Sequence, residues 1–84
     1  MLTIQYFASI REVLNRSEEQ LELPEAITSV QGLIDHLRVG DPHFDTLFND
    51  GNKVLVAVNQ TVVDRNHVLS NDDEIAFFPP MTGG

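Results

Sequence analysis

Cysteine is absent from the 84-residue sequence. This absence excludes a disulfide framework, a thiolate metal site and a cysteine nucleophile. Long hydrophobic runs are absent too: no stretch approaches the roughly 20 apolar residues of a membrane span, and the opening run MLTIQYFASIRE lacks the basic start and apolar core of a secretory signal. We therefore expect a cytoplasmic domain that is stabilised by its hydrophobic core alone.

Positive charge is scarce. Five Lys and Arg stand against thirteen Asp and Glu, so the formal net charge is −8. Nucleic-acid binding depends on Lys and Arg contacts to phosphate, and an anionic membrane surface repels a chain of this charge. The composition, with 42% hydrophobic and 21% charged residues, is that of one folded domain. We expect neither nucleic acid nor a membrane among its partners.

The residues of a conventional active site are also missing. His36, His43 and His67 lack the paired spacing of a zinc site, no serine lies in a G-x-S-x-G elbow, and there is no glycine-rich phosphate loop. The acidic residues between Glu18 and Glu25 are interpreted as a solvated face, with steering toward a basic partner as the functional alternative. The chain is therefore predicted to hold no metal and not to be an enzyme on its own.

Apolar periodicity predicts five strands. Leu2, Ile4 and Tyr6 alternate with polar residues and share one face of the first strand. The remaining strands are predicted at residues 19–23, 54–58, 61–63 and 74–78. The strand at 19–23 has an acidic outer face that suits a sheet edge, whereas the VLVAV run at 54–58 is expected to be central.

Capping signals and helical spacing predict the helices. Boxes of the type S-x-x-E at 9–12 and T-x-x-Q at 28–31 make Ser9 and Thr28 the expected caps. Asp41-Pro42 predicts a third, short helix. The apolar stripe of the main helix is expected at Val30, Leu33, Ile34 and Leu37, and the helix is expected to end at Gly40.

This order of elements predicts an α+β fold. Strands at both ends of the chain, with one main helix between them, favour a mixed sheet of about five strands with that helix packed on one face. This is the β-grasp, or ubiquitin-like, arrangement. Residues 1–80 are expected to form this domain, and residues 81–84 an extended tail.

The last ten residues, from Ile75 to Gly84, carry no charged side chain. Pro79-Pro80 donates no hydrogen bond to a sheet and favours an extended conformation, so the residues that follow are expected to project. Four extended residues span about 13–14 Å. Two glycines give the narrowest possible backbone, which could enter a tunnel that any Cβ would block. A frayed tail is the alternative interpretation.

A carboxylate at the tip of this tail suggests a chemistry that needs no catalytic side chain. A carboxylate is inert toward nucleophiles at neutral pH. After adenylation by an ATP-using partner, the acyl adenylate can accept sulfur or an amine. The chain then needs only a carrier group and surfaces that dock on enzymes.

A docking surface is predicted from strand parity. Phe7 lies opposite the core-facing side chains of the first strand, and Phe78 lies opposite the core-facing side chains of the last. Together with Val62 or Val63, these side chains would form an apolar patch on the sheet face away from the main helix. The alternative is that the helix after Ser9, or the chain after Phe48, covers them.

Two segments are distinctive, the ending FFPPMTGG at 77–84 and the segment AVNQT at 57–61. They resemble the F-F-P-P-V-T-G-G ending and the A-V-N-Q-T segment of the small subunit of molybdopterin synthase, the MoaD family. YFA at 6–8 with Arg11-Glu12, and DEIA at 73–76, resemble two further segments. The sequence departs from the family in having Met81 in place of Val, and Asp72 where the family commonly has Gly.

The resemblance implies a sulfur carrier. Gly84 would be adenylated by an E1-like adenylyltransferase that uses ATP and magnesium, and then converted to a thiocarboxylate. Its sulfur would pass to cyclic pyranopterin monophosphate in molybdenum cofactor biosynthesis. The chain itself would bind no cofactor. The tail residues that would enter the active site of the large synthase subunit are Met81, Thr82, Gly83 and Gly84.

The resemblance also implies a complex of two small and two large subunits. Arg11 is interpreted as a charge at the rim of the docking surface, with a salt bridge within its helix as the alternative. A sulfur carrier for thiamin thiazole synthesis or another sulfur pathway, a ubiquitin-type protein modifier, and a plain interaction domain remain as alternatives for the whole chain. The residues expected to contact partners are Phe7, Arg11, Val62, Phe78 and Pro79.

Overall fold

The computed structural model describes residues 1–49 and 53–80, and the predicted order of strands and helices is confirmed there. The second strand lies one to two residues earlier than predicted. The elements are β1 (Leu2–Tyr6), α1 (Ala8–Leu14), β2 (Glu18–Leu21), α2 (Val30–Gly40), α3 (Pro42–Asn49), β3 (Leu55–Val58), β4 (Thr61–Val63) and β5 (Glu74–Phe78).

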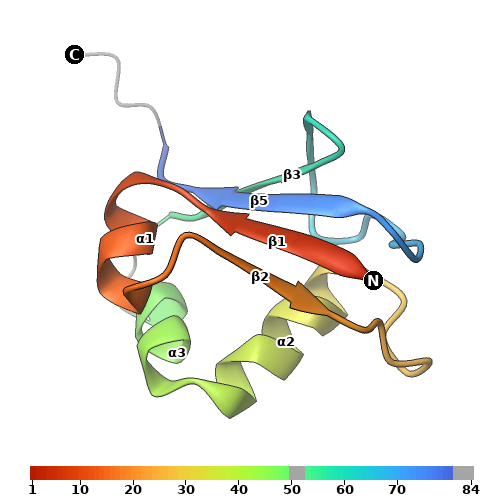
Figure 1. Ribbon diagram of the computed structural model, residues 1–84, viewed down its shortest axis with the longest axis horizontal. Coiled ribbons are helices and arrows are strands. Elements are labelled where there is room, and N and C mark those ends of the chain that lie inside the picture. Colours follow the sequence, from red (N-terminus) through yellow and green to blue (C-terminus); the bar gives the residue numbers. More distant parts are fainter. Residues whose placement is uncertain (50–52, 81–84) are drawn as a thin grey trace.

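The strands form one mixed sheet in the order β2-β1-β5-β3-β4. β1 and β5 run parallel, and every other neighbouring pair is antiparallel. As predicted, β2 is an edge strand and β3 is an interior one. The last strand, β5, lies at the centre of the sheet, so the chain leaves the domain from the middle of the sheet (Figure 1).

The helices cover one face of the sheet, and the core lies between the two layers. Figure 1 shows α2 and α3 on the same side of the sheet and α1 at its end. The predicted stripe of α2 is buried, as are the alternating side chains of β1, and burial of each such side chain contributes about 1.5–3 kcal/mol. This arrangement confirms the predicted α+β fold with a β-grasp topology.

An aromatic cluster joins α3 to the sheet. The rings of Tyr6 and Phe77 are stacked with centroids 6.0 Å apart, and Phe44 meets Phe77 edge-to-face at 5.5 Å. All three side chains are almost fully buried. Burial, together with the negative charge of Glu19, raises the pKa of the Tyr6 phenol above its ordinary value although Arg16 lowers it. Tyr6 is therefore a neutral core residue at any physiological pH.

Both predicted capping boxes are wrong. The α1 helix follows β1 so directly that Phe7 is its N-cap, and no side chain caps it, so Ser9 lies within the first turn instead. At α2 the cap is Ser29, whose Oγ accepts a hydrogen bond from the Gly32 N–H at 3.2 Å. Ser29 has extended backbone and bridges Val68, which places its hydroxyl, not that of Thr28, at the helix end.

The third helix begins as predicted, with Asp41 as its cap and Pro42 in its first turn. Asp41 Oδ1 accepts a hydrogen bond from the His43 N–H at 2.9 Å, and Oδ2 accepts one from the Arg16 guanidinium at 2.8 Å. Burial alone would raise the pKa of Asp41, but these hydrogen bonds outweigh it and hold the pKa below its usual value. Arg16 thereby ties the loop before β2 to the start of α3.

The helices in the described part of the chain are short. The longest, α2, has 11 residues, and none is long and apolar enough to cross a membrane.

Candidate functional site: the outer sheet face and the tail base

The central strand β5 positions the end of the chain. Its side chains alternate, so that Phe77 is fully buried on the helix side while Phe78 lies on the opposite face and is half-buried. Pro79 and Pro80 follow outside the ladder and are also half-buried. The tail residues predicted from the sequence, 81–84, lie outside the described residues. What the structure defines is the base of the tail, at Phe78, Pro79 and Pro80.

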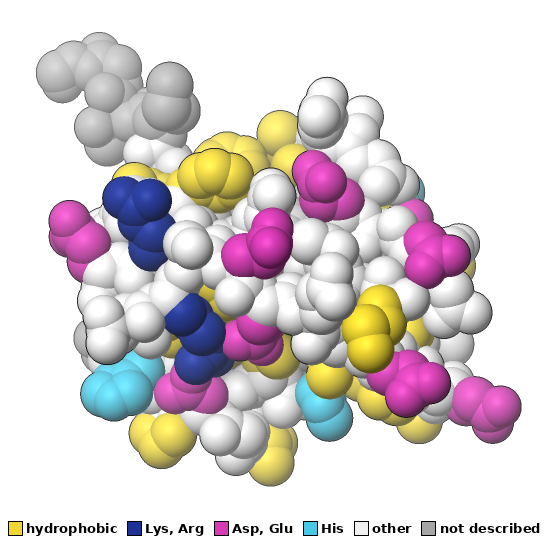
Figure 2. Space-filling model, viewed as in Figure 1, with side chains coloured by type: hydrophobic (Ala, Val, Ile, Leu, Met, Phe, Trp, Pro, Cys, Tyr) yellow, Lys and Arg dark blue, Asp and Glu magenta, His cyan; other side chains and the backbone are white. Residues whose placement is uncertain are grey.

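The face of the sheet away from the helices is apolar at its tail end. Across β3 and β4, Ala57 lies opposite Val62, and across β5 and β3, Leu55 lies opposite Phe78. Because directly opposed residues share a face, these side chains are on the outer side of the sheet. Figure 2 shows hydrophobic side chains gathered along the upper margin of the view, on the side away from α2 and α3.

Phe7 joins this surface through a backbone hydrogen bond. Its N–H donates to the carbonyl of Phe77 at 3.1 Å, which continues the parallel pairing of β1 with β5 by one residue. The Phe7 side chain therefore lies beside Phe78. Phe7 is 46% exposed and Val62 is 62% exposed. We call this surface the outer apolar face; its residues are Phe7, Leu55, Ala57, Val62, Ala76 and Phe78.

The structure decides between the alternatives that the sequence left open. Val63 lies opposite the buried Val56 and packs against the core, so Val62 is the outward residue. The short helix α1 packs against α3 and the end of β5, and neither it nor the described chain after Phe48 covers Phe7 or Val62. Strand parity in the sequence correctly predicted Phe7 and Phe78 as residues of the outer apolar face. Parity within the last strand also places Ala76 on this face with Phe78, whereas Leu55 and Ala57 were missed because only the register of pairing reveals them.

Arg11 lies at the rim of this face. It is exposed on α1 and lines the same shallow surface pocket as Phe7 and Glu18. The ion pairs formed within residues 1–49 and 53–80 do not include Arg11, so the predicted alternative of a helix salt bridge is not found there. An exposed guanidinium beside an aromatic side chain is suited to meet a carboxylate of a partner.

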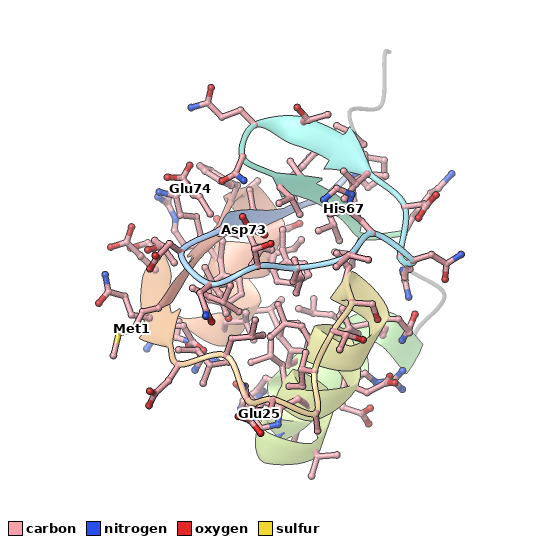
Figure 3. The ribbon with its side chains drawn as sticks, turned by 90° about the vertical axis from the view of Figure 1, so that its right-hand side faces the viewer. Met1, Glu25, His67, Asp73 and Glu74 are labelled. Carbon is pink, nitrogen blue, oxygen red and sulfur yellow. The ribbon has the colours of Figure 1, made fainter. Side chains whose placement is uncertain are left out.

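No group of catalytic or metal-binding side chains accompanies this surface in the described residues. His36, His43 and His67 are exposed and far apart in the sequence, and no three His, Asp or Glu side chains are grouped there as metal ligands. Within the acidic run, Glu19 pairs with Arg16, while Glu25 lies on a loop at the periphery of the molecule (Figure 3).

The fold defines the class of protein first: a ubiquitin-like β-grasp domain. SAMP1 from Haloferax volcanii has this fold with a TM-score of 0.79 at 23% identity, over 99% of this chain and 98% of that chain. A putative molybdopterin converting factor, subunit 1, from Pyrococcus furiosus has a TM-score of 0.74 at 27% identity, over 95% of this chain and 97% of that one.

Sequence comparison identifies the family. The ThiS family matches residues 4–84, and the chain belongs to this family. It is 37% identical over 84 residues to the molybdopterin synthase sulfur carrier subunit of Escherichia coli K12, and 37% identical to that of Haemophilus influenzae, in each case over 100% of both chains. The sulfur carrier subunit of Mycobacterium tuberculosis is 32% identical over 99% of this chain and 96% of its own length. These matches confirm the family resemblance drawn from the segments at 57–61 and 77–84.

Proposed function

We propose that this chain is the sulfur carrier subunit of a molybdopterin synthase. The observation that carries the proposal is the match at 37% identity, over 100% of both chains, to a carrier subunit of that name. The structure supports it independently, because the central strand delivers the base of the tail beside an exposed apolar surface. The chain supplies a docking surface and a carrier group, and its partner enzymes supply the catalytic residues.

The chemistry resides in the carboxylate of Gly84. In the first step a carboxylate oxygen attacks the α-phosphorus of ATP and pyrophosphate leaves, which gives an acyl adenylate. Hydrosulfide supplied by the sulfur donor then attacks the acyl carbon and AMP leaves, which gives the thiocarboxylate without a redox step. ATP and magnesium belong to an E1-like adenylyltransferase, and this chain binds neither. The thiocarboxylate sulfur then bonds to cyclic pyranopterin monophosphate, and water cleaves the bond from sulfur to the acyl carbon, which restores the Gly84 carboxylate.

The outer apolar face is the proposed docking surface. A large synthase subunit would cover Phe7, Val62 and Phe78, while residues 81–84 enter its active site past Pro79. Exposed apolar patches on small proteins commonly mark such interfaces, and burial of an aromatic anchor such as Phe7 contributes much of the binding free energy. Arg11 would contact a carboxylate at the rim. We propose a complex in which a dimer of large subunits binds two copies of this chain. We propose that this complex acts in the cytoplasm.

Intact-mass measurement tests this function. The chain is incubated with the E1-like adenylyltransferase, ATP, magnesium and a sulfur donor, and its mass should rise by the difference between one sulfur atom and one oxygen atom. A variant that lacks Gly83 and Gly84 is the control and should not change. If the full chain also stays unchanged while a known carrier reacts, the proposal fails.

Affinity capture distinguishes this function from a second candidate, a sulfur carrier for thiamin thiazole synthesis or another sulfur pathway. Such a carrier would gain the same mass, because the chemistry at Gly84 is shared. The large molybdopterin synthase subunit from the same genome should bind this chain with higher affinity than a thiazole synthase does. The opposite order of affinities would favour the alternative.

A further inference from the structure

A second apolar surface adjoins the base of the tail. It is a groove of about 300 Å³ between α1, α3, the chain before β3 and the prolines after β5. The described residues that line it are mostly apolar. We call it the tail-base groove; its lining residues are Ser9, Ile10, Val13, Leu47, Lys53, Val54, Pro79 and Pro80.

This groove adjoins the base of the tail directly. Pro79 and Pro80 line it together with Val13 of α1, which is 43% exposed. Phe78, the residue before Pro79, belongs to the outer apolar face. The tail base therefore stands between two apolar surfaces, and a partner that encloses the tail as far as Pro79 must bring its own surface against both.

The distribution of positive charge points to the same place. The chain has five basic residues. Arg16 and Arg38 form ion pairs with Asp41 and Asp45, and Arg65 stacks on the ring of Phe48 with its guanidinium carbon 5.1 Å from the centroid.

The other two basic residues, Arg11 and Lys53, form no ion pair within residues 1–49 and 53–80. Both are exposed, and both border the tail base: Arg11 lies beside Phe7, and Lys53 lines the groove with Pro79 and Pro80. Among the described residues, three basic side chains form no ion pair; Arg11 and Lys53 lie at the tail base, and the third, Arg65, stacks on Phe48.

We propose that the tail-base groove is a second docking contact for the large synthase subunit. The occupant is an apolar side chain at the rim of that subunit's active-site entrance, together with a carboxylate that faces the ammonium group of Lys53. This inference rests on the proposed function and adds to it a surface, a residue and the chemistry of the partner. The proposal excludes a partner that presents basic side chains to the groove, because Lys53 would repel them.

The charge arrangement has a kinetic consequence. A partner with an acidic rim is repelled by the body of this chain and attracted at the tail base, so encounters in which the tail points toward the partner are favoured. Charges at the rim of an interface act mainly on the association rate and on its dependence on salt. Apolar side chains that are buried on binding act mainly on the dissociation rate. Lys53 and Val13 should therefore have separable effects.

Charge-matched variants test the role of Lys53. Lys53→Gln and Asn71→Asp each lower the net charge by one, but Asn71 lies in the exposed turn that precedes β5, whereas the tail follows the other end of that strand. Association with the purified large subunit is measured by stopped flow at several salt concentrations. Lys53→Gln should slow association about two- to fivefold at low salt and flatten the salt dependence, whereas Asn71→Asp should have a smaller effect. Lys53→Arg should restore the rate.

A second pair of variants tests the groove itself. Val13→Gln and Val39→Gln both replace an exposed helical valine, 43% and 90% exposed, so both proteins should fold. Only Val13 lines the groove. Val13→Gln should raise the dissociation rate from the large subunit several-fold, and Val39→Gln should leave it unchanged.

The outcomes separate this inference from the proposed function. If the wild-type chain binds the large subunit and becomes thiocarboxylated, but Lys53→Gln behaves like Asn71→Asp and Val13→Gln like Val39→Gln, the groove is not a contact and the inference is wrong. If the wild-type chain does not bind the large subunit at all, the proposed function fails and the inference fails with it.

Discussion

The backbone N–H of Phe7 donates a hydrogen bond of 3.1 Å to the carbonyl of Phe77, and this bond extends the pairing of the first strand with the last beyond the end of β1. It turns the Phe7 ring to the outer face of the sheet, next to Phe78 and the base of the tail. Residues at opposite ends of the sequence thus form one surface. The position of the tail and the docking surface therefore depend on the same strand pairing.

Replacement of Phe7 tests the outer apolar face. Phe7→Ala should weaken binding to the large subunit about fivefold or more, because an aromatic anchor in an interface commonly contributes more than about 1 kcal/mol. Since Phe7 is 46% exposed in the free chain, the midpoint of thermal unfolding should change little. Calorimetric titration measures the affinity, with Val39→Ala as the control at a distant exposed valine. An unchanged affinity for Phe7→Ala would remove this face from the interface.

The aromatic cluster should dominate the stability of the fold. Phe44→Ala removes a fully buried ring that contacts Tyr6 and Phe77, and it should lower the free energy of unfolding by about 3–5 kcal/mol. Urea unfolding followed by circular dichroism measures this loss. A loss below about 1 kcal/mol would mean that α3 does not pack on the sheet as described.

The cap of α2 can be tested by two neighbouring variants. Ser29→Ala removes the oxygen that accepts the Gly32 N–H, and it should cost about 0.5–2 kcal/mol of unfolding free energy. Thr28→Ala is the matched control and should cost less, because the structure gives the Thr28 side chain no capping role. The reverse order of the two losses would restore the capping box that the sequence predicted.

The pH dependence of stability should include a contribution from Asp41. Its pKa is lowered in the folded chain, so its ionised form stabilises the fold above the ordinary pKa of an aspartate, and this stabilisation is lost as the pH falls through the folded value. Asp41→Asn retains an oxygen that can cap α3 but removes the charge that pairs with Arg16. The variant should be less stable than the wild type at pH 7, by up to about 1 kcal/mol. In acid the two proteins should converge; a difference that grows in acid would contradict this assignment.

The sequence predicted those features that depend on local periodicity. The alternation of Leu2, Ile4 and Tyr6 and the helical stripe of α2 were sufficient to place the core, because each pattern reports which side of an element is buried. Helix starts were less predictable. Thr28 and Ser29 are both capping residues, and only the bridge between Ser29 and Val68, a contact distant in sequence, decides between them.

The candidate site was predictable only in part for the same reason. Phe7 and Phe78 follow from strand parity, but the choice of Val62 over Val63 depends on the register between β3 and β4. The tail-base groove was not found from the sequence. Its walls come from α1, α3, the chain before β3 and the prolines after β5, and no pattern within one element indicates that they meet.

Transfer of sulfur tests the central claim most directly. The thiocarboxylated chain is mixed with the large subunit and cyclic pyranopterin monophosphate, and its intact mass is followed together with the formation of molybdopterin. The sulfur carrier function predicts that the mass returns to that of the free carboxylate as the dithiolene product appears. A chain that keeps its sulfur under conditions where a known carrier subunit loses it would contradict the account.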